Sequence, residues 1–203
     1  MLETELVQTI YLNESQKIEL LDLLVDAFKD QPFKCALDPL DTREYSSRWL
    51  LEKRIALYGD SSWTLLSGEK VIGHVCLNCP GNEDYSFLTL VYHGFLLAPY
   101  MIGWTVFSRL NASITKFKKP KRMESYWTIN LVAIDKQYRG KGLGKNLMNS
   151  IMEKLPSDVT VHLDTQLDTN VAFYKSLGFN LVHEQDITLV DSTFHSWTLI
   201  KNI

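Results

Sequence analysis

Residues 137–144, which read QYRGKGLG, constrain the fold of this 203-residue chain more than any other stretch. The apolar residues 129–134 just before them suit a buried strand, and Leu143, Leu147 and Ile151 just after them recur at helical spacing. The glycines therefore lie where a strand turns into a helix. Glycine permits positive φ and close approach of a ligand, and the first N–H groups of a helix have no partner within it. With the helix dipole, this arrangement predicts a site for a phosphate or pyrophosphate.

Positive charge surrounds these glycines, in the side chains of Arg139, Lys141 and Lys145. Two common phosphate loops do not fit the stretch. Its glycines are spaced G-x-G-x-G, whereas the dinucleotide fingerprint requires G-x-G-x-x-G and the P-loop requires G-x-x-x-x-G-K-S/T. For these few residues alone, an ordinary glycine-rich turn is the simpler alternative.

Three longer segments point to one family. Residues 139–144 match the pattern R/Q-x-x-G-x-G/A and resemble the pyrophosphate loop of the GNAT superfamily of N-acetyltransferases. Residues 170–179, NVAFYKSLGF, are similar to the family segment N-x-x-A/P-x-x-Y-x-x-x-G-F, and residues 126–134 resemble a strand of its puromycin N-acetyltransferase-like branch. Two residues depart from the family pattern: Lys136 replaces a proline of the branch, and Asp164 replaces a glutamate of many members.

The resemblance covers nearly the whole chain and is strongest from 126 to 179. It implies the α/β (α+β) class and a single N-acetyltransferase domain over residues 1–203. The expected sheet is mixed, mostly antiparallel and twisted, with about seven strands flanked by helices and a splay between strands 4 and 5.

Hydrophobic periodicity predicts where the elements lie. Strands are expected at residues 3–12, 61–66, 70–77, 126–134, 158–163, 181–189 and 193–200. Helices are expected from Asn13 to Pro32 and at residues 41–58, 142–155 and 170–177. An apolar stretch at 87–117 is expected to break near Pro99.

The resemblance also implies acetyl coenzyme A as the acetyl donor. Its pyrophosphate would contact the glycine loop, and its pantetheine arm would pair with the preceding strand like an added strand. An unpaired N–H near Ala133 would polarise the thioester carbonyl. The residues expected to bind this cofactor are Val132, Ala133, Ile134, Arg139, Gly140, Lys141, Gly142, Leu143, Gly144, Lys145, Asn170 and Tyr174.

Tyr174 stands at the family's position for the general acid that protonates the departing thiolate. A phenol of pKa about 10 is a plausible acid for a thiolate of pKa about 8.5. The alternative is that Tyr174 only packs against Phe173 and Phe179.

The sequence offers several candidates for the general base that deprotonates the amine. His162 and Asp164 are the catalytic candidates, because residues two apart on a strand share a face. Glu124, His93 or a chain of water molecules are the alternatives, and a histidine within a strand is more often structural.

The expected acceptor is the primary amine of a small molecule or peptide, which attacks directly in a ternary complex. Aromatic residues in the segments that would line its pocket suit an amine with an apolar body, although many of them would serve the core equally well. The residues assigned to the substrate are Phe28, Phe33, Trp49 and Tyr92.

Charge and cysteine content limit the partners. The net charge of −3 and the pI of about 6.0 argue against a nucleic-acid partner. Three cysteines do not suggest a disulfide framework, and the acidic start of the chain does not resemble a signal peptide, so a cytoplasmic monomer or homodimer is expected.

Three other interpretations stay open. Residues 87–107 carry no formal charge and are long enough to span a bilayer, but they contain Pro99, two glycines and a histidine, so stable membrane insertion is not expected. His74, Cys76 and Cys79 have spacing that suits zinc but lack a fourth ligand, so no metal is assigned. A non-catalytic sensor of acetyl coenzyme A would also use the glycine loop.

Overall fold

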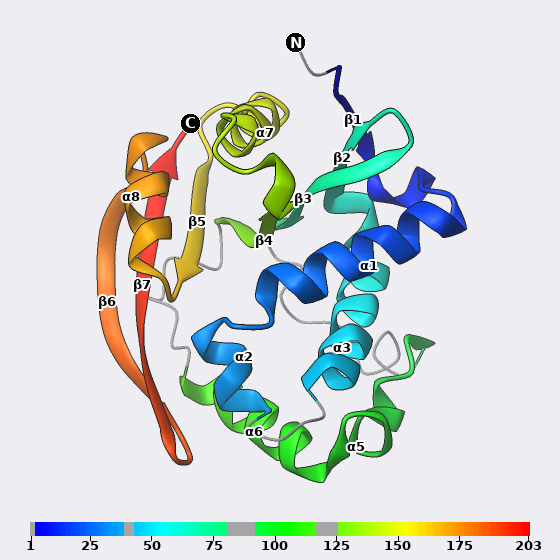
Figure 1. Ribbon diagram of the computed structural model, residues 1–203. Helices are drawn as coiled ribbons and strands as arrows, with labels where there is room; N and C mark the ends of the chain where they lie inside the picture. The colour runs from blue at the N-terminus through cyan, green and yellow to red at the C-terminus, as the bar shows by residue number, and fades with distance from the viewer. Residues whose placement is uncertain (1–2, 39–42, 81–91, 117–125) are drawn as a thin grey trace.

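Seven strands form one sheet in the order β1-β2-β3-β4-β5-β7-β6 (Figure 1). The computed structural model describes residues 3–38, 43–80, 92–116 and 126–203. All neighbouring strands are antiparallel except β4 and β5, which are parallel. The expected fold class, a mixed and mostly antiparallel sheet flanked by helices, is confirmed. The strands are β1 (Glu5–Gln8), β2 (Ser62–Ser67), β3 (Lys70–Asn78), β4 (Trp127–Ile134), β5 (Thr160–Thr165), β6 (Asn180–Leu189) and β7 (Ser192–Asn202).

Helices cover both faces of the sheet. The principal helices are α1 (Glu14–Phe28), α2 (Pro32–Leu37), α3 (Arg43–Tyr58), α5 (Ala98–Met101), α6 (Gly103–Lys116), α7 (Leu143–Met152) and α8 (Asp168–Ser176). One face packs α7 and α8 against β3, β5 and β7 in the largest apolar cluster. The other face packs α1 against β3 and β4, and α2 with α6 against the β6–β7 hairpin.

The parallel ladder between β4 and β5 is short. It consists of three consecutive residue pairs, the last of which joins Ile129 to Leu163. Just beyond it, β4 bulges at Asn130, because the neighbouring residues Ile129 and Leu131 pair with consecutive residues of β3. The predicted splay between the fourth and fifth strands is therefore confirmed, and it begins earlier than at Ala133, where we expected it.

The first half of the chain differs from the predicted elements in two ways. The N-terminal strand ends at Gln8, because Thr9 to Tyr11 form a 3-10 turn. Pro32 and Pro99 begin helices instead of only ending them, since proline fits the first turn of a helix, where its missing N–H has no role. The loop predicted at 79–86 lies largely outside the described residues.

Candidate active site

The glycine loop has the backbone geometry that the sequence predicts. Gly140 and Gly142 have φ values of 74° and 78°, and Gly142 is the N-cap of α7. A Cβ at either glycine would meet no atom within 4 Å, so both present open backbone at the start of the helix. Gly144 has another role, because its Cβ would lie 3.5 Å from the Phe173 ring, so glycine lets α7 approach α8 closely.

Residues just before the glycines hold the loop to the sheet. Asp135 accepts a hydrogen bond from the Gln137 N–H at 2.8 Å, and its own N–H donates to the Ile72 carbonyl at 2.9 Å. Arg139 Nε donates to the Ile134 carbonyl at 2.9 Å, which fixes the loop to the end of β4. Lys141 lies over the Tyr138 ring at 5.1 Å. Lys141 and Lys145 are exposed beside the glycines, where phosphate charge is expected.

The end of β4 offers backbone to a ligand. Val132, Ala133 and Ile134 pair with β3 on one side. On the side of β5, they have no strand partner among the described residues. These are the three residues predicted to pair with the pantetheine arm.

Buried polar side chains form a row across the sheet face that α1 and α2 cover. Register makes them neighbours: Asn78 pairs with Thr128, Thr128 with His162, and Asp164 with Thr198. All except Asp164 are at most 7% exposed. We call this row the polar stripe, and its members are Asn78, Thr128, His162, Asp164, Thr198 and Ser196. It crosses the sheet where β4 and β5 separate.

Hydrogen bonds join most of the polar stripe. Thr128 Oγ1 lies 3.0 Å from His162 Nδ1, and Thr198 Oγ1 donates to Asp164 Oδ1 at 2.5 Å. His162 Nε2 lies 3.9 Å from Asp164 Oδ2. His162 is completely buried, whereas Asp164 is exposed, so Asp164 is the end of this pair that a substrate can reach.

Two buried atoms of the stripe lack hydrogen bonds within the described part of the chain, namely Asn78 Oδ1 and Ser196 Oγ. Such groups cost free energy when they stay unpaired. They are therefore suited to a polar ligand that lies on this face.

Tyr174 lies on the opposite face of the sheet, in the apolar cluster with α7. Its ring packs edge-on against Phe173 and Phe179 at 5.1 and 5.8 Å. Burial raises the pKa of Tyr174 well above its usual value, so the hydroxyl keeps its proton at neutral pH. Asn170 Nδ2 donates to Thr165 Oγ1 at 3.1 Å and thereby ties the start of α8 to the end of β5.

The four aromatic residues assigned to the substrate do not gather in one cluster. Phe28, the last residue of α1, packs against the cluster between α1 and β3, Phe33 packs against β7, and Trp49 packs against Phe95. Tyr92 is 87% exposed. The structure gives Trp49 a core position, with 8% of its surface exposed.

The remaining sequence candidates do not join the polar stripe among the described residues. His74 and Cys76 are buried in β3, and among the described residues no group of His, Cys, Asp and Glu side chains has the geometry of a metal site. His93 lies beside Tyr92, and Glu124 lies outside the described residues. No described helix is both long and apolar enough to cross a membrane.

Four members of the polar stripe were not predicted from the sequence, namely Asn78, Thr128, Ser196 and Thr198. The sequence does contain a pattern that indicates two of them. Ser196 and Thr198 alternate with large side chains along a predicted strand, as His162 and Asp164 do. Polar residues at every second position of two strands indicate a polar face where the strands pair.

The sequence model of the acetyltransferase (GNAT) family matches residues 19–179 of this chain. No curated protein matches it by sequence.

Solved structures with low sequence identity share the fold. A Corynebacterium glutamicum protein described as histone acetyltransferase HPA2 and related acetyltransferase has a TM-score of 0.68 at 18% identity, with 98% of this chain and 96% of that chain covered. The Drosophila melanogaster polyamine N-acetyltransferase, which forms N-acetylagmatine, has a TM-score of 0.65 at 14% identity, with coverage of 99% and 100%. A chain of the NatC complex bound to Gag peptide and CoA has a TM-score of 0.58 at 13% identity, with 99% of both chains covered.

Proposed function

Because this chain belongs to the acetyltransferase (GNAT) family, and is thus an N-acetyltransferase that uses acetyl coenzyme A, we propose that it acetylates the primary amine of a small molecule or peptide by direct attack in a ternary complex. One observation carries the proposal. The strand edge that would receive the cofactor and the polar stripe that would receive the amine meet where β4 and β5 separate. The two reactants would therefore reach each other between the two halves of the sheet.

The residues around the glycine loop fit the cofactor. The open backbone at Gly140 and Gly142, together with Lys141 and Lys145, would hold the pyrophosphate. The free edge of Val132 to Ile134 would hold the pantetheine arm as an added strand. When bound, acetyl coenzyme A supplies the acetyl group as an activated thioester.

Proton acceptor and proton donor would act from opposite faces of the sheet. We assign Asp164 the role of general base, which accepts the proton of the incoming ammonium, because its carboxylate is exposed and is oriented by Thr198. His162 is too deeply buried to touch the amine, so we assign it the positioning of Asp164. Tyr174 would give the proton of its hydroxyl to the leaving sulfur from the other face.

The polar stripe also bears on the acceptor. A carboxylate and two unpaired buried oxygens favour an ammonium group with several hydrogen-bond donors. Phe28 and Phe33 would contact its apolar part, while Trp49 and Tyr92 are less favourably placed.

Two finer assignments belong to the same proposal. The motifs between residues 126 and 179 favour the puromycin N-acetyltransferase-like branch. Three free cysteines favour the cytoplasm, where thiols stay reduced.

The proposal is tested by thiol release from acetyl coenzyme A with a panel of primary amines. Asp164→Asn keeps the shape of the side chain but removes the proton acceptor, so turnover should fall about 100-fold. Coenzyme A affinity should not change, because Asp164 does not belong to the glycine loop.

Asp168→Asn is the matched control, since Asp168 is an exposed acid in the first turn of α8 and lies outside the polar stripe. If Asp164→Asn and Asp168→Asn turn over equally, Asp164 is not the base. If the wild type acetylates no amine of the panel, acetyl transfer to small amines is the wrong activity.

A further inference from the structure

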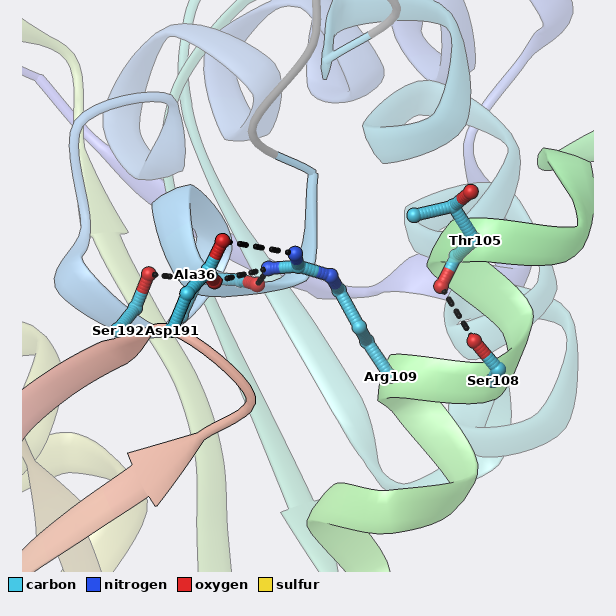
Figure 2. Close-up of polar contacts among 6 residues, drawn as sticks. All are labelled: Ala36, Thr105, Ser108, Arg109, Asp191 and Ser192. Carbon is cyan, nitrogen blue, oxygen red and sulfur yellow. Dashed lines mark hydrogen bonds and ion pairs between the residues drawn. The ribbon is translucent and has the colours of Figure 1, made fainter.

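Arg109, on α6, is buried although its guanidinium carries a full charge, and its side chain is only 9% exposed. Figure 2 shows that it joins two segments far away in sequence. Nη1 donates to the carbonyl oxygen of Ala36 in α2 at 2.8 Å. Nη1 and Nη2 also form a forked pair with the carboxylate of Asp191, at 3.0 and 3.3 Å. Asp191 lies in the turn between β6 and β7.

An apolar cluster lies on the Arg109 side of this contact. Its buried members come from α2 and the β6–β7 hairpin, and α6 adds Leu110 at its edge. Phe33 of α2 packs edge-on against Phe194 of β7 at 6.0 Å. The buried members are Ala36, Leu37, Ile187, Leu189 and Phe194. Arg109 thus connects α2, α6 and the β6–β7 hairpin, and we call this three-way contact the joint. Figure 1 shows it near the turn of the hairpin, at the bottom of the view.

This joint continues directly into the polar stripe. Phe194, Ser196 and Thr198 are successive same-face residues of β7, each about 7 Å from the next. α2 covers Phe194, and Thr198 holds Asp164. The position of α2 over β7 therefore sets how much room an amine has beside Ser196 and Asp164.

Stability alone does not require a charge at this position. Only the Arg109 side of the pair is buried, since the Asp191 side chain is 64% exposed. An exposed carboxylate adds little to the stability of an ion pair, whereas a forked arginine–carboxylate pair fixes geometry. The hydrogen bond from Arg109 lowers the pKa of Asp191, so the pair is charged at neutral pH.

We propose that Arg109 is a positioning residue for the acceptor amine: by joining α2 to the β6–β7 turn, it fixes the height of α2 above the polar stripe. The inference rests on the proposed function, because it assigns the amine to that stripe. The glycine loop lies at the start of α7, which packs on the opposite face of the sheet, so cofactor binding should be independent of Arg109.

The test compares amine KM, turnover number, coenzyme A affinity and amide hydrogen exchange among four variants. Asp191→Asn and Arg109→Gln break the charged fork. Arg109→Lys keeps the charge but loses the fork, so its effect should be intermediate. Asp186→Asn is the control, because Asp186 lies on the same hairpin but on its other face, where it contacts His195 Nδ1 at 2.6 Å.

Asp191→Asn and Arg109→Gln should raise the amine KM about tenfold, as expected when a substrate is misplaced by a fraction of an ångström. Coenzyme A affinity should stay at the wild-type value, and the amides of residues 33–38 should exchange faster. Asp186→Asn should behave like the wild type.

An unchanged amine KM in both variants would overturn the inference, as would a parallel loss of coenzyme A affinity, which indicates general damage. If the wild type acetylates no amine, the proposed function fails by itself. Hydrogen exchange then tests the joint separately: faster exchange of the amides of residues 33–38 in both variants supports it, and unchanged exchange overturns it.

Discussion

The surroundings of Tyr174 raise a specific question about proton transfer. Burial among Phe173, Phe179 and the core raises its pKa, which keeps the proton on the hydroxyl but makes the phenol a weaker acid. In water a thiolate of pKa about 8.5 is a weaker base than this phenolate, so proton transfer from Tyr174 would be uphill. A departing thiolate held between β4 and β5 would lose its water as well, which raises its pKa and makes it a better proton acceptor.

Tyr174→Phe separates the two roles of this side chain. If the hydroxyl protonates the leaving sulfur, the turnover number should fall about 100-fold, while the ring keeps its packing and the melting temperature hardly changes. Turnover, coenzyme A affinity and melting temperature are measured for this variant and for Tyr174→Ala.

Tyr174→Ala should instead lower the free energy of unfolding by about 3 kcal/mol or more, because it leaves a cavity in the core. Wild-type turnover by the Phe variant would show that Tyr174 only packs. An assay with a poorer thiol leaving group checks whether another step hides the defect, since a true acid defect should then grow.

At the scale of elements, the start of α7 combines open backbone with positive φ. Gly142→Asp should abolish the rise in melting temperature that coenzyme A causes in the wild type, because it places a side chain and a negative charge where phosphate is expected. A thermal-shift titration with coenzyme A measures this rise.

Gly68→Asp is the matched control. Gly68 lies between β2 and β3, has a φ of 61°, and likewise has no atom within 4 Å of an added Cβ. Both variants should lose about 1–2 kcal/mol through backbone strain, but only Gly142→Asp should lose the response to coenzyme A. Equal responses in the two variants would contradict the loop assignment.

The elements also show why the glycine loop was predictable and the polar stripe was not. The loop is encoded locally, because glycine favours the positive φ that Gly140 and Gly142 adopt. The stripe depends on register between strands far apart in the chain, and the bulge at Asn130 shifts which residues of β4 face the stripe. Trp49 illustrates a second limit, because an aromatic residue at helical spacing looks the same whether it packs in the core or lines a pocket.

At the scale of the whole molecule, His74 links stability to pH. It is completely buried, its Nδ1 lies 3.3 Å from Thr64 Oγ1, and burial lowers its pKa to about 3. The unfolded chain binds a proton at this residue below its ordinary pKa of about 6.5, whereas the folded chain does not bind it until about pH 3. Stability from neutral His74 is thus present above pH 6.5 and is lost as the pH falls.

His74→Gln should therefore flatten the acid side of the stability curve. Between pH 6 and pH 4, the free energy of unfolding of the wild type should fall by about 1.4 kcal/mol per pH unit more than that of the variant. Urea unfolding at several pH values measures the two slopes. Parallel slopes would show that His74 binds its proton equally in the folded and the unfolded chain, and so that its pKa is not lowered.

The short ladder between β4 and β5 also bears on folding cooperativity. Among the described residues, three residue pairs join two antiparallel halves, β1–β4 and β5–β7, into one sheet, and the apolar cluster that contains α7 includes residues of both halves. Regions that share few backbone hydrogen bonds open and close as separate foldons. The boundary between the two halves is also the place where we propose that the reactants meet. Coenzyme A bound there would contact both halves, so we expect the two foldons to unfold as one in its presence.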